Sequence, residues 1–296
     1  NEMGEFEKAL FNTNRSLKLY ESLNTLSSSK TGITLCLSEI ASIYQKTGKL
    51  DEALDYRKKL LNINYETNNQ YGIATTIADI GKIYYDMKKY NEALKYYNQS
   101  MNISLQFHDS IAIGITLNNI GALFERKGDY SRSLTYYKKA LDIFLHAGYK
   151  YGIAYGYFNL GSISAKKKNY DIAISYFSKS LRISESIALL ENEADCYKEI
   201  ALVQYEAGKY KSAFDNYLKY NQIRDSIYTE ELTKRMASIE HRFQIENKEK
   251  EKEQSQPSSS SPSATGPSIH GVAFEGKRNL GGNYTAPKSL LEDPEL

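Results

Sequence analysis

Two asparagines in this chain carry side chains that suit recognition of a peptide backbone. Asn119 and Asn159 lie 40 residues apart, and each directly precedes an aliphatic residue and a glycine. A carboxamide both donates and accepts hydrogen bonds, so one asparagine can pair with a single peptide unit of an extended ligand. Such pairing tolerates many ligand sequences, because it reads the backbone rather than the side chains. The repeated position therefore predicts two equivalent backbone anchors.

No other group of residues in the sequence predicts chemistry. His241 is followed by Arg242, whereas the phosphoacceptor box of histidine kinases has an acidic residue there. All four histidines are scattered and lack partners at metal-binding or triad spacing: His108, His146, His241 and His270. We therefore predict that the protein is not an enzyme and has no catalytic residues, no metal site and no cofactor.

The elements that must position the asparagines recur every 40 residues. Columns of small, aromatic and aliphatic residues keep this register over five copies, as in Ala53, Ala93, Ser133, Ala173 and Ala213, or in Ile63, Ile103, Ile143, Ile183 and Ile223. A fixed period of this length indicates stacked supersecondary units, that is, a solenoid with a long surface and no enclosed pocket.

Each unit predicts two amphipathic helices separated by a break. In the third unit, Leu117, Ile120 and Phe124 share one face of a first helix. Gly128-Asp129 breaks the chain, and a second helix is expected over residues 130–145. Small residues recur where helices approach closely, and aromatic rings fill the gaps between layers.

This pattern resembles the tetratricopeptide repeat. The family motif (large, aliphatic-Gly, aromatic, then aromatic, small, aromatic, small) is matched by Leu117, Ile120-Gly121, Phe124, Tyr130, Ser133, Tyr137 and Ala140. The resemblance implies an all-α, right-handed superhelical α-solenoid of stacked helix-turn-helix repeats. Similar 40-residue arrays occur in bacterial signalling proteins and peptide-binding adaptors. Arg57, Ser164 and Gln204 replace motif aromatics, and we expect looser packing in their layers.

The expected organisation follows the repeat register. We predict an array over residues 1–228, with a half repeat at 1–26 and repeats at about 31–70, 71–110, 111–150, 151–190 and 191–228. Because the half repeat lacks a first helix, the chain is expected to be a fragment of a longer protein. Residues 229–254 are predicted to form a capping or coiled-coil-like helix, with Leu232, Met236, Ile239 and Phe243 at heptad-like spacing. A Ser/Pro-rich linker at 255–268 and a disordered, fused or motif-bearing tail at 269–296 complete the chain.

The resemblance further implies that the first helix of each repeat turns its non-packing face into a concave groove. The predicted groove residues are Asp79, Lys82, Tyr85, Asn118, Asn119, Arg126, Tyr155, Phe158, Asn159, Ser162 and Lys166. Aromatic residues among them suit apolar ligand side chains, and Arg126 and Lys166 suit acidic ones. On the same face, Asp195, Glu199 and Glu206 make the groove mixed in sign.

Composition limits the partners. Lys and Arg total 38 against 36 Asp and Glu, a net charge of +2, which lacks the basic footprint of a nucleic-acid binder. No apolar stretch approaches the roughly 20 residues of a membrane span. Cys36 and Cys196 are four repeat periods apart and are expected to be buried thiols rather than a disulfide. We predict a cytoplasmic location.

These observations predict a non-enzymatic protein–protein interaction scaffold that binds an extended peptide or a partner protein in its groove. Two alternatives remain open. The array can be the sensory or regulatory segment of a bacterial signalling protein, such as a histidine kinase or a transcription regulator, whose output domain lies outside this chain. The groove can also be occupied by the chain's own C-terminal tail.

Overall fold

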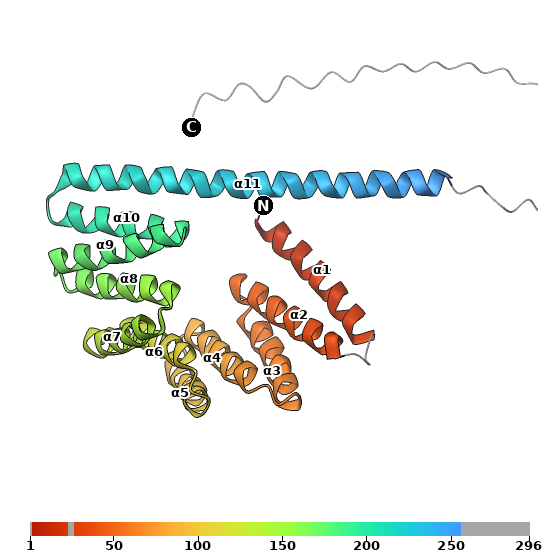
Figure 1. The fold of residues 1–296 in the computed structure, drawn as a ribbon, viewed down its shortest axis with the longest axis horizontal. Coiled ribbons are helices and arrows are strands. Elements are labelled where there is room, and N and C mark those ends of the chain that lie inside the picture. Colours follow the sequence, from red (N-terminus) through yellow and green to blue (C-terminus); the bar gives the residue numbers. More distant parts are fainter. Residues whose placement is uncertain (1, 23–26, 256–296) are drawn as a thin grey trace, which may run out of the picture. The chain divides into compact units, whose positions relative to one another are not determined.

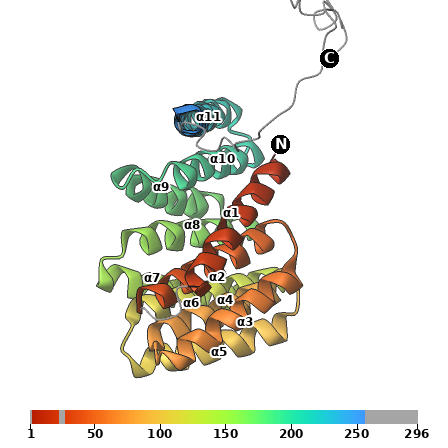
Figure 2. The same ribbon diagram turned by 90° about the vertical axis from the view of Figure 1, so that its right-hand side faces the viewer.

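A computed structural model describes residues 2–22 and 27–255, and these ranges contain helices and no strand (Figure 1). The helices are α1 (Glu2–Ser22), α2 (Ser27–Lys46), α3 (Leu50–Glu66), α4 (Gln70–Asp86), α5 (Tyr90–Gln106), α6 (Ser110–Arg126), α7 (Tyr130–Ala147), α8 (Lys150–Lys166), α9 (Tyr170–Ser186), α10 (Leu190–Glu206) and α11 (Tyr210–Ser255). From α1 to α10, each helix packs against the next one in the chain (Figure 2). The predicted all-α solenoid of helix-turn-helix units is confirmed.

We number the repeats by their helix pairs. Repeat 1 is α2–α3, repeat 2 is α4–α5, repeat 3 is α6–α7, repeat 4 is α8–α9, and repeat 5 is α10 with the start of α11. The even-numbered helices are the first helices, and α1 precedes repeat 1 and packs against α2. From α3 to α10 every helix has 17 residues except α7, which has 18. This regularity places equivalent side chains at equivalent heights in every layer.

A left-handed residue ends the helices at intervals of 20 residues. In each of these turns φ lies between 49° and 77°. The residues are Gly48, Lys88, Gly128, Lys168 and Gly208 within repeats, and Asn68, His108, Gly148 and Ala188 between them. Glycine adopts this conformation without steric cost, and the turn satisfies carbonyls at the helix end. At Gly128, for example, the backbone N–H donates to the carbonyl of Glu125 over 2.9 Å.

The core lies between consecutive repeats. A small residue and a ring on a second helix face an aliphatic pair, three residues apart, on the next first helix. Ala93 and Tyr97 of α5 share a buried cluster with Ile120 and Leu123 of α6. Equivalent groups are Ala53 with Ile80 and Ile83, Tyr137 with Leu160 and Ile163, and Ala173 and Phe177 with Ile200 and Val203. Each fully buried aliphatic side chain contributes about 1.5–3 kcal/mol.

Close contact within a repeat requires glycine on the first helix. A Cβ added to Gly121 would lie 2.7 Å from Cδ1 of Tyr137, a distance that real Cβ atoms do not show. Gly81 and Gly161 meet Tyr97 and Phe177 in the same way. The aliphatic-Gly pair that comes after each asparagine is therefore a packing feature, and it holds the first helix against the ring of its own repeat.

The chain divides into two compact parts, residues 1–238 and 239–296. The second helix of repeat 5 and the predicted C-terminal helix are one continuous helix, α11, which crosses this boundary. Residues 256–296, which include most of the predicted linker and the whole tail, lie outside the described residues, and the side chains of Ile239 and Phe243 are not described either. Among the described helices, none combines the length and the apolar character that crossing a membrane requires.

Candidate functional site

The first helices form a continuous row, because α4 contacts α6, α6 contacts α8, and α8 contacts α10. We call the solvent-facing side of this row the first-helix face. It carries a ladder of hydrogen bonds in which each rung joins residues 41 positions apart: Gln45–Asp86, Tyr85–Arg126, Asn118–Asn159 and Glu125–Lys166. The repeat is 40 residues long, so the partner of each residue lies one position beyond its equivalent in the next repeat.

Two of the three predicted cations on this face, Arg126 and Lys166, are engaged within the chain. Arg126 Nε donates to the hydroxyl of Tyr85 over 3.0 Å. Lys166 Nζ lies 2.6 Å from Oε1 of Glu125, and the hydroxyl of Tyr137 donates to the other oxygen of that carboxylate, also over 2.6 Å. Acidic ligand groups would therefore have to compete with existing partners at both cations.

The asparagines differ in their surroundings. Asn159 Nδ2 donates to Oδ1 of Asn118 over 2.8 Å, so this amide is partly used within the array. Asn119 is partly buried, and its side chain has no partner among the residues that the structure describes. The structure thus pairs Asn159 with Asn118 and leaves the Asn119 amide available.

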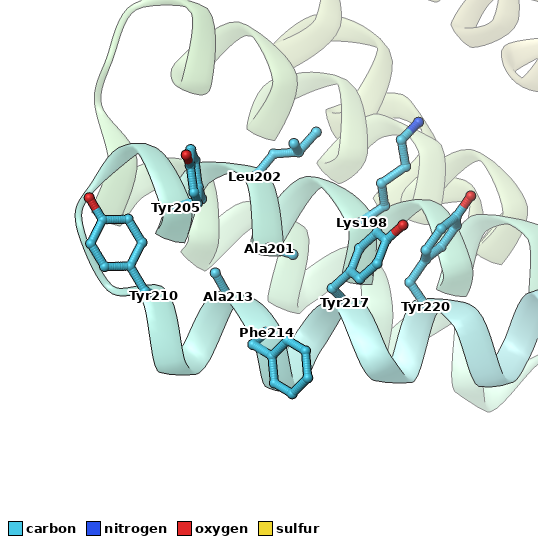
Figure 3. A pocket seen from close by; sticks show the side chains of 9 residues that line it. All are labelled: Lys198, Ala201, Leu202, Tyr205, Tyr210, Ala213, Phe214, Tyr217 and Tyr220. Carbon is cyan, nitrogen blue, oxygen red and sulfur yellow. The ribbon is translucent and has the colours of Figure 1, made fainter.

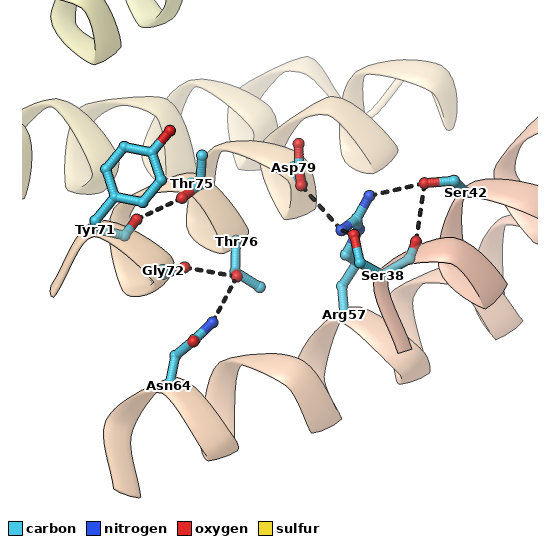
Figure 4. A network of polar contacts seen from close by, with 9 residues as sticks. All are labelled: Ser38, Ser42, Arg57, Asn64, Tyr71, Gly72, Thr75, Thr76 and Asp79. Atoms are coloured by element: carbon cyan, nitrogen blue, oxygen red, sulfur yellow. Dashed lines mark hydrogen bonds and ion pairs between the residues drawn. The ribbon is translucent and has the colours of Figure 1, made fainter. Parts of the chain in front are cut away.

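Asp79 belongs to a polar network around Arg57, in the layer where later repeats bury an aromatic ring. Arg57 takes the place that Tyr97 and Tyr137 occupy in later repeats, and it is buried. Its guanidinium donates to Ser38 and Ser42 and lies 3.1 Å from Asp79 (Figure 4). Removal from water raises the pKa of Asp79, while the charges of Arg57 and Lys82 act against this rise. The network links α2, α3 and α4 at the expected looser layer.

A hollow of about 390 Å³ opens where the ladder stops, between α6, α8 and α10. The next rung would join Ala165 to Glu206, but alanine has no polar group to offer. The hollow is lined by Glu125, Phe158, Ser162, Ala165, Lys166, Glu199, Leu202, Val203 and Glu206. We call it the acidic hollow, because apolar side chains meet three carboxylates and one ammonium group there.

The carboxylates near this hollow are partly desolvated. Burial raises the pKa of Glu199, and the neighbouring Asp195 adds to the rise, against the charges of Lys198 and Lys166. Burial also raises the pKa of Asp195, against the charges of Lys198 and Arg224 and with a smaller contribution from Glu191. Tyr155 is 41% exposed on the adjoining part of α8, and burial raises the pKa of its hydroxyl. This end of the first-helix face therefore favours positive charge.

The sequence pattern of the tetratricopeptide repeat matches residues 33–106, 72–146 and 152–225, which together make up more than half of the chain. The chain belongs to the tetratricopeptide repeat family. As a member of this family it is a repeat domain of the protein-interaction or regulatory type. No curated protein sequence matches the chain.

Solved tetratricopeptide-like structures share this fold. BtubC (BKLC) from P. vanneervenii has a TM-score of 0.63 at 18% identity, covering 75% of this chain and 92% of that one. The apo form of RapI has a TM-score of 0.58 at 19% identity, covering 77% and 80%. A STAND signal-transduction ATPase with a tetratricopeptide repeat sensor from Pyrococcus horikoshii has a TM-score of 0.57 at 21% identity, covering 73% of this chain but 35% of that one. At these identities the likeness concerns the fold alone.

The predicted groove residues all lie on tetratricopeptide first helices, but the set omitted residues that shape the face. Glu125 holds Lys166, Leu202 lines the acidic hollow, and Arg57 fixes Asp79. A search for polar pairs at a 41-residue offset would have found the rungs. The partners of Arg57 could not be found in this way, because they lie on different helices and are not separated from it by a common number of residues.

Proposed function

We propose that the first-helix face binds an extended peptide segment of a partner protein. The observation that carries the proposal is the Asn119 amide, which is partly buried and, among the described residues, without a partner on a face where neighbouring polar groups are paired. A carboxamide in this position is free to pair with one peptide unit of a ligand. Asn159 keeps its carbonyl oxygen as an acceptor, since its contact with Asn118 uses the NH₂ group.

Charge at the acidic hollow favours a basic ligand side chain. The raised pKa values of Glu199 and Asp195 mean that their charged forms are disfavoured by burial. An arriving lysine or arginine would compensate this cost and form charge-assisted hydrogen bonds. Phe158 and Leu202 offer apolar contact to the stem of such a side chain. We therefore propose a ligand with a lysine or arginine flanked by small apolar residues.

Because the helix stack is preformed, little of the binding energy is spent on ordering the receptor. The backbone anchors would hold many sequences, and the acidic hollow would select among them. Self-binding by residues 269–296 remains an alternative occupant of the same face, and so does an entire partner protein that presents such a segment.

The test uses fluorescent nine-residue peptides with a central lysine and matched peptides with a central glutamate. We expect the lysine peptides to bind more tightly. Asn119→Ala combined with Asn159→Ala should weaken both peptide sets by about thirtyfold, because each of the two anchor bonds contributes about 1 kcal/mol. Glu199→Gln should weaken only the lysine set. Fluorescence anisotropy measures both effects.

Asn98→Ala is the matched control, because Asn98 is an exposed asparagine on α5, which is a second helix. Circular dichroism establishes that each variant keeps its helix content. A folded double variant that binds every peptide as the natural chain does would refute the backbone anchors. A chain shortened to residue 255 that binds more tightly than the full chain would identify the tail as a competitor.

A regulatory role is the second candidate, and α11 favours it. This helix has 46 residues and continues past the first compact part. Leu232 and Met236 are exposed on it at 46% and 64%. Such a helix can transmit a ligand signal from the array to another domain. Hydrogen exchange over residues 239–255 tests this idea: protection that depends on bound peptide supports it, and unchanged exchange contradicts it.

A further inference from the structure

Repeat 5 exposes a surface that every earlier repeat buries. The ring on the second helix is 1% exposed at Tyr97, 1% at Tyr137 and 0% at Phe177, but the equivalent Tyr217 is 50% exposed. Phe214, which comes directly after the small residue Ala213, is 61% exposed. The sequence pattern of the interface is therefore present in repeat 5, and among the described residues the next first helix is missing.

These side chains line a hollow of about 500 Å³ between α10 and α11, and Figure 3 shows them projecting from the two adjoining helices. The lining residues are Lys198, Ala201, Leu202, Tyr205, Tyr210, Ala213, Phe214, Tyr217 and Tyr220. We call this surface the α10–α11 face. It is more aromatic than its interior equivalents, since Phe214 and Tyr220 stand where repeat 4 has Ile174 and Ser180.

The interior repeats show what such a face accepts. Each interior copy is covered by a first helix that contributes two aliphatic residues three positions apart. These pairs are Ile80 with Ile83, Ile120 with Leu123, Leu160 with Ile163, and Ile200 with Val203. None of their side chains is more than 5% exposed. The complementary shape for a face of this type is thus a helix with aliphatic residues at i and i+3.

We propose that the α10–α11 face binds an amphipathic helix of a partner protein that carries an aliphatic pair at i and i+3. The interface would continue the helix stack, since it repeats an arrangement that the chain already forms between its own repeats. It differs from the first-helix face proposed to bind extended peptides, because its occupant is helical and packs against a second helix, although Leu202 lines both hollows.

Two features define the occupant further. Asn221 and Arg224 replace Leu181 and Ser184 of repeat 4, so the receiving surface becomes polar after the third turn of α11. A helix of about three turns therefore covers the apolar part. The chain's own first helices bury their aliphatic pairs inside their own stack, so a second copy could offer one only by leaving that stack.

The test uses a stapled, fluorescent peptide with the sequence of α10, residues 190–206, carrying Cys196→Ser to prevent oxidation. The staple is needed because an isolated helix of this length is marginal in water. We expect saturable binding to the full chain. Phe214→Ser and Tyr217→Ser should each weaken binding by about tenfold or more, as for aromatic anchors at other interfaces. A peptide with Ile200→Asp and Val203→Asp should not bind.

Tyr228→Ser is the matched control, because Tyr228 is a 68% exposed ring on the same helix and does not line the hollow. It should leave binding unchanged. The proposal is overturned if the α10 peptide does not bind, or if the aspartate peptide binds equally well. It is also overturned if light scattering shows a dimer that Phe214→Ser dissociates, which would assign the face to a second copy. Binding that requires removal of residues 256–296 would assign the face to the chain's own tail.

Discussion

Repeats 4 and 5 carry similar residues at the motif positions of their second helices, but those residues have different surroundings. Phe177 of repeat 4 is covered by Ile200 and Val203 of the following helix, whereas Tyr217 of repeat 5 faces an open hollow. The difference arises from the neighbouring layer and not from the repeat's own motif. In a solenoid, the presence of a following repeat therefore decides whether a motif residue is buried in the core or exposed at the surface.

The same contrast applies to charge. In the interior, Glu125 is held by Lys166 and by the hydroxyl of Tyr137. In repeat 5, burial raises the pKa of Glu199 against the charges of Lys198 and Lys166, and Lys166 already contacts Glu125. The Glu125 carboxylate of the interior is thus satisfied by neighbouring side chains, while repeat 5 keeps both apolar and acidic groups that a partner can satisfy.

The largest expected difference concerns the ring itself. Phe177→Ala should lower the free energy of unfolding by about 3–5 kcal/mol, because it leaves a cavity in a buried cluster. Tyr217→Ala should cost about 1 kcal/mol, since half of this ring is already exposed. Urea unfolding followed by circular dichroism measures both. Equal losses for the two variants would mean that the α10–α11 face is covered in solution.

A smaller effect is expected at the glycine that faces the ring. Gly121→Ala should lower the free energy of unfolding by about 1–2 kcal/mol, because overpacking against Tyr137 exceeds the gain in helix propensity. Repeat 5 already carries Ala201 at this position, opposite the half-exposed Tyr217. Gly4→Ala is the control, since a Cβ there meets no atom within 4 Å. It should stabilise α1, and a stabilising Gly121→Ala would contradict the contact.

The sequence predicted the fold well, because the repeat motif encodes contacts that recur in every layer. The aliphatic pair, the small residue and the ring each appear at a constant period, and so they could be assigned to helix faces without coordinates. The ladder was not predicted, because its 41-residue offset depends on how successive layers are displaced. Arg57 shows the same limit: its partners Ser38, Ser42 and Asp79 lie on different helices and obey no repeat rule.

Turn residues allow a gain in stability. Ala188→Gly should raise the free energy of unfolding by about 0.5–1 kcal/mol, because Ala188 holds a left-handed φ of 54° that suits glycine. Gly208→Ala, at a φ of 75° in repeat 5, should have the opposite effect. Thermal unfolding of the two variants at one pH gives the comparison. A loss of stability in Ala188→Gly would show that its methyl group contributes more than the strain costs.

The smallest effect separates the charge of repeat 5 from that of the interior. Because burial raises the pKa of Glu199, the folded chain prefers the protonated carboxyl more than the unfolded chain does. Its stabilising contribution is therefore complete below its ordinary pKa of about 4.3 and is lost as the pH rises through the higher value of the folded state.

Glu199→Gln should raise Tm slightly at pH 7, by less than about 2 °C, and leave it unchanged near pH 3.5. Glu125→Gln should instead lower Tm at pH 7, because Lys166 loses its ionic partner. If both variants responded alike, the acidic hollow would be an ordinary part of the array, and its desolvated carboxylates would no longer favour a basic ligand.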